Sequence, residues 1–439
     1  MVKRLSLGLL SLLLIVVLAA CGGAAKESAS SGSDNTTTKN ESVKLQIVGS
    51  DWDDTSMEKL KTENPSSLYY QVRNAVEERY PDYKVDFQNW GWAEELDQKQ
   101  RAAILSGNVP DIVHGETFMP TYAAEDILAP LPEDIVNAVN PNFLIRNKAG
   151  EPVGVSPKGN VFLLFYNKDL LTQAGMDAES VQLDSWDAWK TVADKITAEG
   201  AGDLFGGAIP SHPNTGGALR FTAVARSVGA DWGGGDEVTI NTPEMAKALQ
   251  YLRDMDQNFP KGIGNGTDEG PLYKMFNEDK NLGFVINGTW QTGDAKTHNL
   301  NYGVTSLPVA EGGESSNCLV GFDYYGVTKA SKNQEAAFNV IRLMLDKDIL
   351  KTAVQKEVVP PATTELQADG EILGISPILE MAIQEISKGE LKGLPVFNKN
   401  NSQIWDIINT KVIARATMTS DSIDEILKEA QSETERLLQ

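Results

Sequence analysis

The side chains best placed to do chemistry in this chain are acidic and aromatic residues that follow predicted strands. Asp51, Trp52 and Asp53 form a polar, helix-breaking run directly after the first predicted strand. Trp90 and Glu116 come just after the second and third strand candidates. A flat ring offers an apolar platform, and a carboxylate at its rim accepts hydrogen bonds from hydroxyl groups. These residue types therefore favour a site for a hydroxyl-rich molecule such as a sugar.

These positions also leave alternatives open. The aspartates around Trp52 would suit calcium, but the run lacks the loop glycine and the terminal glutamate of an EF-hand. Asp53 and Glu116 could instead form a carboxylate pair that cleaves a glycosidic bond across a cleft. Trp90 and Trp92 flank a glycine, and we expect Trp90 to face the site while Trp92 packs.

The composition excludes several classes of protein. The 439 residues include 61 acidic and 39 basic side chains, and the net charge of -22 repels nucleic acid. Three histidines without metal-ligand spacing and two distant cysteines predict neither a metal site nor a disulfide scaffold. The chain also lacks a GxxxxGKS/T phosphate loop and a GxSxG nucleophile turn. We therefore expect a function that needs no metal or other cofactor.

The N-terminus is predicted to be a targeting signal rather than part of the fold. Basic residues precede an apolar run that is too short for a comfortable membrane span. The run ends in Leu-Ala-Ala and then Cys21, which resembles the bacterial lipobox, whose cysteine carries acyl chains such as palmitate. The alternative is an ordinary signal peptide with a chance cysteine. We predict a signal peptide over 1–20 and, over 21–42, a lipidated cysteine with a flexible tether, so that the folded part lies outside the cell membrane.

From residue 43 onward, short apolar runs alternate with amphipathic stretches, as in an α/β fold. Residues 43–48 alternate as a strand, and a helix over 94–106 leads into a strand at 111–113. This order places loops at strand ends, where α/β folds bind their ligands. Residues that suit helix caps punctuate the rest of the chain at Ser185, Thr242, Ser331 and Ser422.

Several short segments occur in an order that is typical of one known family. They are SGNVPDIV at 106–113, LLFYNKDLLTQAG at 163–175, SWDAW at 185–189, FVINGTW at 284–290, NYGVTSLP at 301–308 and KASKN at 329–333. Together they resemble the bacterial extracellular solute-binding family that includes the maltose-binding protein. The likeness covers most of 43–439.

The resemblance implies a two-lobed, periplasmic-binding-protein-like α/β fold with hinge crossovers and a ligand cleft between the lobes. The first lobe would hold 43–158 and 295–345, and the second 159–294 and 346–439. The implied function is that of a lipid-anchored carrier, which binds a carbohydrate, above all an oligosaccharide, and delivers it to the permease subunits of an ABC transporter. Such a carrier would act as a monomer and would break no bond.

The resemblance also implies further ligand contacts. Asn160 would fall on the first hinge, and His212 on a loop of the second lobe. Trp290, at the end of its strand, would stack on a sugar ring. The same matching adds Asp323 and Tyr324 before the last helix of the first lobe and Trp405 in the C-terminal helical region. Trp232, beside three glycines, is either a loop aromatic or a further platform.

Two other functions stay open at this point. One is a surface hydrolase or lyase that acts on the same kind of carbohydrate. The other keeps the fold but carries a peptide, a polyamine or an iron chelate. Eight tryptophans favour a sugar, whereas the acidic balance leaves room for a cationic ligand.

Overall fold

The computed structural model describes residues 42–207, 215–262, 270–314, 317–389 and 391–439. The predicted signal peptide, Cys21 and almost all of the tether lie outside these residues, and so does His212.

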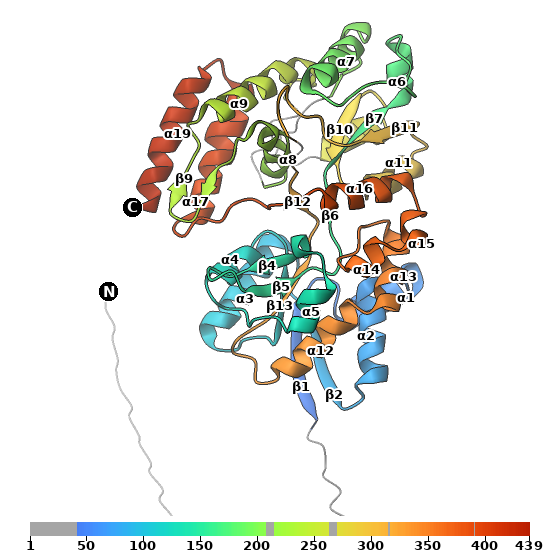
Figure 1. The fold of residues 1–439 in the computed structure, drawn as a ribbon, viewed down its shortest axis with the longest axis vertical. Helices are drawn as coiled ribbons and strands as arrows, with labels where there is room; N and C mark the ends of the chain where they lie inside the picture. Colours follow the sequence, from blue (N-terminus) through green and yellow to red (C-terminus); the bar gives the residue numbers. More distant parts are fainter. Residues whose placement is uncertain (1–41, 208–214, 263–269, 315–316, 390) are drawn as a thin grey trace, which may run out of the picture. The chain divides into compact units, whose positions relative to one another are not determined.

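A six-stranded sheet organises the first half of the fold (Figure 1). Its strands are β1 (Val43–Gly49), β2 (Tyr83–Asn89), β3 (Ile112–Gly115), β4 (Leu144–Arg146), β5 (Pro152–Val155) and β13 (Tyr324–Val327). In the order β2-β1-β3-β13-β5-β4, β1 runs parallel to β2 and β3, and β13 runs antiparallel to β3 and β5. The predicted first strand is confirmed, with Leu45 and Ile47 buried.

The helices of this half follow the amphipathic stretches of the sequence. α2 buries Leu68, Val72, Ala75 and Val76 along one face, as expected for a helix that packs on a sheet. α3 ends at Gly107, which has the left-handed φ of 79° that favours glycine. The bounds are α1 (Asp54–Glu63), α2 (Leu68–Arg79), α3 (Ala93–Ser106), α4 (Met119–Ala124), α5 (Glu133–Ala138), α12 (Gln334–Met344), α13 (Lys347–Glu357), α14 (Thr364–Gln367) and α15 (Gly370–Leu373).

A three-stranded antiparallel sheet organises the second half. It consists of β7 (Leu163–Asn167), β10 (Phe284–Asn287) and β11 (Tyr302–Thr305), with β7 in the centre. The apolar run at the start of β7 is wholly buried because the strand is paired on both edges and covered by side chains.

Helices from two distant stretches of the chain complete the second half (Figure 1). A π-helix, Ile408–Ala414, joins α17 to α18, and the short strands β8 (Gly233–Gly234) and β9 (Glu237–Val238) form a small ribbon. The helices are α6 (Lys168–Gln173), α7 (Trp186–Glu199), α8 (Thr215–Ala225), α9 (Pro243–Met255), α10 (Gly270–Asn277), α11 (Gln291–Thr297), α17 (Asn401–Ile407), α18 (Arg415–Met418) and α19 (Ile423–Leu438).

Three of the predicted helix caps are confirmed. Ser185, Thr242 and Ser422 each accept a hydrogen bond from the backbone N–H three residues further on. Ser331 is the exception, because α12 begins only at Gln334 and the Ser331 hydroxyl donates to Asp111 instead. The Ser331 oxygen still accepts a hydrogen bond from the Asn333 N–H at 3.1 Å, but Asn333 precedes α12, so this bond does not cap a helical N–H.

In the described residues, the chain passes between the two halves at three places. It leaves β5 and enters β7 through β6 (Asn160–Val161). It returns from β11 to β13 through β12 (Leu319–Val320), which pairs antiparallel with β6. The third passage starts at α16 (Pro377–Ser387), which packs against β6, and continues through a segment at 391–398 to α17. We call residues 391–398 the strap.

Two of the lobe boundaries implied by the resemblance are therefore wrong. A boundary at 295 places β11 in the first lobe, yet β11 pairs with β7 in the second half. A boundary at 346 places α13 in the second lobe, yet α13 packs against α2 and α12, and Asp346 forms an ion pair with Arg79. The motifs locate elements along the chain, but pairing and packing decide which half each element joins.

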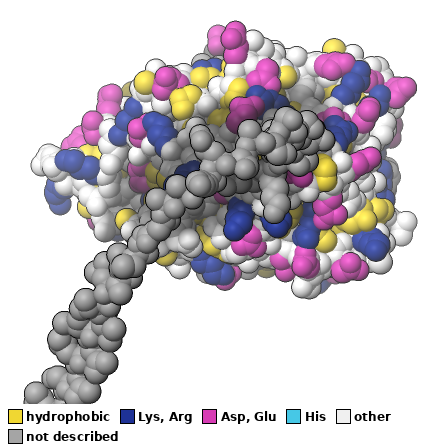
Figure 2. All heavy atoms as spheres, turned by 90° about the horizontal axis from the view of Figure 1, so that it is seen from below, with side chains coloured by type: hydrophobic (Ala, Val, Ile, Leu, Met, Phe, Trp, Pro, Cys, Tyr) yellow, Lys and Arg dark blue, Asp and Glu magenta, His cyan; other side chains and the backbone are white. Residues whose placement is uncertain are grey.

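None of the helices in the described residues combines the length and the apolar character that a bilayer span requires. Within the same residues, no group of three or more His, Cys, Asp or Glu side chains could hold a metal ion. On the face shown in Figure 2, acidic and basic side chains are interspersed, and hydrophobic ones form small scattered groups. That visible face offers no extended basic area for a phosphate backbone.

Candidate ligand-binding site

A hollow with a volume of about 810 Å³ lies between the halves. Glu116 and Tyr324 line it from the first half, and Arg226 and Asp231 line it from the second. Strap residues 391–395 form a further part of its wall. We call it the interlobe hollow. Its size suits a ligand of several rings, and any such ligand would touch both halves.

A smaller hollow of about 470 Å³ lies at the ends of the parallel strands β1 and β2. Because the carboxyl ends of parallel strands meet at one edge of a sheet, the loops after them are brought together there. Asp51 follows β1, Trp92 follows β2, and Asp323 stands just before β13; all three line this hollow. We call it the strand-end hollow. It brings together two of the predicted acidic residues.

The aromatic residue at this hollow is not the predicted one. Trp92 is 46% exposed and lines the strand-end hollow. Trp90 is half-buried against the core and donates its Nε1 hydrogen to Gln88 Oε1 at 2.7 Å. The prediction that Trp90 faces the site and Trp92 packs is therefore wrong. Gly91 between them has a φ of 94°, so the backbone turns between the two tryptophans. The spacing of the residues in the sequence does not predict which ring then faces the hollow.

Asp53 has a structural task in this fold. Its carboxylate caps α1 by accepting hydrogen bonds from the Ser56 backbone N–H at 3.2 Å and from the Ser56 hydroxyl. The Ser56 hydroxyl, together with that N–H, lowers the pKa of Asp53 and keeps it ionised. A general acid must hold a proton near neutral pH, so this environment does not suit Asp53 to that role.

Glu116 and Asp323 are neighbouring carboxyl groups with opposite pKa shifts. Burial and the nearby charge of Asp323 raise the pKa of Glu116 to about 7, although Gly321 N–H donates to its Oε1 at 3.0 Å. Burial also acts to raise the pKa of Asp323, but His114, Lys158 and the Tyr69 hydroxyl outweigh it and lower that pKa. The pair therefore offers a fixed acceptor beside a group that can donate or accept a hydrogen bond near neutral pH.

Asn160 is enclosed at the crossover and lines neither hollow. Its amide is fully buried, and Nδ2 donates to Thr289 Oγ1 at 2.7 Å. Thr289 in turn donates to the Val358 carbonyl at 2.6 Å. The prediction that this amide meets ligand hydroxyls is corrected, because its hydrogen bonds hold crossover segments together instead.

Two of the predicted tryptophan platforms are also wrong, since both rings are fully buried. Trp52 stacks on Phe87 with ring centroids 5.5 Å apart and meets Tyr69 edge-on at 4.9 Å. Trp232 donates to Thr222 Oγ1 at 2.8 Å and meets Trp405 edge-on. Neither ring has a free face for a sugar. Each supports its half of the fold.

Trp405 and Trp290 keep partial exposure. Trp405 is half-buried, and its Nε1 donates to the Pro395 carbonyl in the strap at 3.1 Å. Trp290 is 38% exposed and lies beside Gly321 at the boundary of the halves, where an added Cβ would come within 3.1 Å of the ring. Neither ring lines either hollow: Trp405 supports the strap wall of the interlobe hollow, and Trp290 stays a predicted contact at the boundary of the halves.

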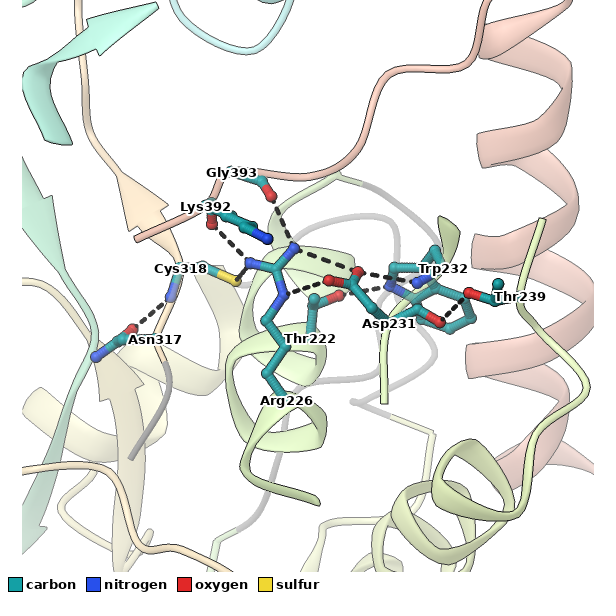
Figure 3. A network of polar contacts seen from close by, with 9 residues as sticks. All are labelled: Thr222, Arg226, Asp231, Trp232, Thr239, Asn317, Cys318, Lys392 and Gly393. Atoms are coloured by element: carbon teal, nitrogen blue, oxygen red, sulfur yellow. Dashed lines mark hydrogen bonds and ion pairs between the residues drawn. The ribbon is translucent and has the colours of Figure 1, made fainter. Parts of the chain in front are cut away.

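The residues that the sequence did not point out are Arg226 and its partners. Arg226 follows α8, and Figure 3 shows its guanidinium between Asp231, Cys318 and the backbone of Lys392 and Gly393. No motif marks these positions, because they lie up to 167 residues apart in the chain. Their only sequence signal is a lone arginine at the end of an apolar helix.

Two packed α/β halves joined by short crossovers, with a hollow between them, define a two-lobed binding protein. A sequence profile of the bacterial extracellular solute-binding proteins matches residues 59–350. The chain belongs to this family.

Named relatives and solved structures agree with this assignment. The galactooligosaccharide-binding protein of Bacillus subtilis is 24% identical over 275 residues, which are 59% of this chain and 60% of that protein. The maltooligosaccharide ABC transporter solute-binding lipoprotein of Streptococcus pneumoniae is 22% identical over 52% of this chain and 53% of its own. The chain thus matches less than two thirds of the length of these relatives.

Among solved structures, the likeness extends over nearly the whole chain. The cyclic alpha-maltosyl-1,6-maltose binding protein of Arthrobacter globiformis superposes with a TM-score of 0.71 at 20% identity, covering 90% of this chain and 99% of its own. The sugar-binding protein MalE of Xanthomonas citri gives a TM-score of 0.72 at 18% identity, covering 90% and 97%. At such low identity these structures establish the fold.

Proposed function

We propose that this protein is the substrate-binding component of an ABC importer, and that it binds an oligosaccharide between its two halves. The observation that carries the proposal is the interlobe hollow of about 810 Å³, which both halves line. A ligand that touches both halves favours the closed arrangement over the open one. Several relatives named above are oligosaccharide-binding proteins, which supports a sugar as the cargo.

The polar groups of the site suit hydroxyls better than a fixed charge. Asp323 is an acceptor, and Glu116 can donate or accept near neutral pH because its pKa is about 7. Tyr324 lines the same hollow as Glu116, and Trp92 supplies an exposed ring at the strand-end hollow. Hydroxyl donors and acceptors beside aromatic rings are what sugar recognition requires.

The test is a thermal-shift screen of the purified protein against mono- and oligosaccharides, followed by titration calorimetry. A ligand present at about 100 times its dissociation constant adds about 2.7 kcal/mol of stability, which is easily detected. We expect oligosaccharides to stabilise the protein and simple peptides and polyamines not to. Stabilisation by a polyamine alone would replace the sugar as the cargo.

In this proposal the protein carries its ligand without breaking a bond. Asp53 caps α1 and lines neither hollow, whereas Glu116 lines the interlobe hollow, so the two carboxylates of the alternative glycosidase pair do not line one site. Incubation with the bound oligosaccharide should return it unchanged in chromatography. Product that accumulates with time would make the protein an enzyme.

We further propose that Cys21 carries the lipid anchor and that the monomer faces the outside of the cell membrane. The lipobox resemblance and the pneumococcal relative, which is named a lipoprotein, support this. The Cys21→Ser variant should leave the membrane fraction in cell fractionation. Retention of this variant in the membrane would exclude Cys21 as the anchor.

A further inference from the structure

The Arg226 guanidinium donates hydrogen bonds to the Asp231 carboxylate and to two backbone carbonyls. Its Nε and Nη2 donate to both oxygens of Asp231 at 3.0 and 3.3 Å. Nη1 donates to the Lys392 carbonyl at 2.6 Å and Nη2 to the Gly393 carbonyl at 2.9 Å (Figure 3). Its side chain is only 8% exposed. One guanidinium therefore joins the end of α8 to the strap.

The strap depends on a small number of such ties. Near its start, Leu391 N–H donates to Asn142 Oδ1 of the first half at 2.8 Å. Near its end, the backbone of Gly235 exchanges hydrogen bonds with Val396 and Asn398. Between these points, Lys392 bridges to Cys318 next to β12, Arg226 binds the carbonyls of Lys392 and Gly393, and Trp405 binds the carbonyl of Pro395.

Only arginine can satisfy this arrangement fully. Its planar fork presents donors in fixed directions, so it can bind a carboxylate on one edge and carbonyls on the other. A lysine has one compact ammonium and cannot hold all three partners in this geometry. Loss of Arg226 would leave the Gly393 carbonyl without its donor, the Lys392 carbonyl with only the Leu319 N–H at 3.4 Å, and the Asp231 carboxylate with the Trp232 N–H.

We propose that Arg226 is a positioning residue, which holds the strap against β12 and thereby fixes one wall of the interlobe hollow. We call the hydrogen bonds from Arg226 to the strap carbonyls the latch. The strap moves away from β12 when these bonds are broken, and a ligand in the interlobe hollow favours the state in which they are formed. The second statement rests on the proposed function, whereas the first does not.

The protein contains its own reporter for the latch. Cys318 is fully buried, its Sγ lies 3.4 Å from Arg226 Nη1, and it pairs with Lys392 of the strap. Burial also raises the pKa of its thiol to about 11, so the latched state contains little reactive thiolate. Release of the strap uncovers this thiol and should speed its reaction with a disulfide reagent.

The experiment measures the labelling rate of Cys318 by Ellman's reagent in the full chain carrying Cys21→Ser, which leaves Cys318 as the only thiol. The variants are Arg226→Gln and Arg226→Lys, with Arg415→Gln as the matched control. Arg415 also pairs with two acids, Asp421 and Glu429, but contacts no strap residue. Urea unfolding of each variant confirms that labelling occurs in the folded protein.

We expect Arg226→Gln to label about tenfold faster or more, because the latch consists of charge-assisted hydrogen bonds. Arg226→Lys should label at a rate between those of Arg226→Gln and the parent, and Arg415→Gln should label at the parental rate. If Arg226→Gln does not fold, Arg226→Lys carries the test, because it keeps a positive charge beside the Cys318 thiol and loses the planar fork that binds the strap carbonyls. Labelling of the folded variants at the parental rate would overturn the latch.

A second measurement separates the latch from the proposed function. An oligosaccharide found in the screen should slow the labelling of the parent, and Arg226→Gln should bind it about tenfold more weakly. Faster labelling without any sugar binding would keep the latch and remove the proposed function. Equal sugar affinity with parental labelling would remove the latch and keep the function.

Discussion

The interlobe hollow and the strand-end hollow are built in different ways. The strand-end hollow is lined by residues of the first half alone, at the ends of β1 and β2 and beside β13. The interlobe hollow draws on both halves and on the strap. The first is a local property of one sheet, whereas the second exists only while the crossovers hold the halves in place. Substitutions at the strand-end hollow should therefore affect only contacts within the first half. Substitutions at the crossovers or the strap should change the interlobe hollow even where the substituted residue does not line it.

The largest expected effect separates the buried from the exposed tryptophan of the first half. Trp52→Ala removes a fully buried ring and should lower the free energy of unfolding by about 3–5 kcal/mol. Trp92→Ala removes a ring that is 46% exposed and should cost less than about 1 kcal/mol. Urea unfolding measures both. If Trp52→Ala abolished binding while stability stayed unchanged, Trp52 would be a platform after all.

The next effect concerns the boundary of the halves. Trp290→Ala should weaken oligosaccharide binding by about 1–3 kcal/mol, because a stacked ring contributes most where water is excluded. Trp90→Ala is the control, since Trp90 packs half-buried against the core of the first half, whereas Trp290 is 38% exposed beside Gly321 at the boundary of the halves. Titration calorimetry compares the two variants. Unchanged affinity in Trp290→Ala would remove this ring from the site.

The sequence predicts the strand-end hollow better than the interlobe one. Strand ends, capping residues and Gly107 are local signals, so the placement of Asp51 and α3 follows from short stretches of chain, whereas Asp323 comes from the resemblance and reaches this hollow through the pairing of β13 with β3. The direction of a ring is not local. Trp52 turns inward and Trp92 outward because of the Asp51 φ of 58° and the Gly91 φ of 94°, which the residue types alone do not specify.

The interlobe hollow could not be predicted residue by residue. Arg226, Cys318 and the strap meet only after three crossovers have formed, and no spacing in the chain encodes that meeting. The same reason explains the wrong lobe boundaries, since the placement of β11 and α13 is decided by long-range pairing and packing. The family resemblance predicted the two-lobed architecture, but long-range tertiary contacts decide which half each element joins.

Glu116 lines the interlobe hollow and gives a pH test. Its pKa rises from 4.5 to about 7 on folding, so between these values the folded protein binds more protons than the unfolded chain. Stability from this group is therefore full at low pH and is lost as the pH rises through 7, by about 2 kcal/mol after allowance for partial exposure. Glu116→Gln should remove this slope in urea unfolding between pH 4.5 and 7.5. Parallel curves for the variant and the parent would show that Glu116 titrates normally.

The smallest effect distinguishes a cap from a ligand contact at the end of β1. Asp53→Ala removes the α1 cap and should cost about 1 kcal/mol of stability, whereas Asp53→Asn keeps a capping side chain and should cost little. Both variants should retain sugar affinity because the Asp53 carboxylate is already bound by Ser56. Asp51→Asn removes a charge from the lining of the strand-end hollow and should weaken binding instead. If Asp53→Asn lost affinity at unchanged stability, the carboxylate would contact the ligand, and the boundary of the strand-end hollow would have to include it.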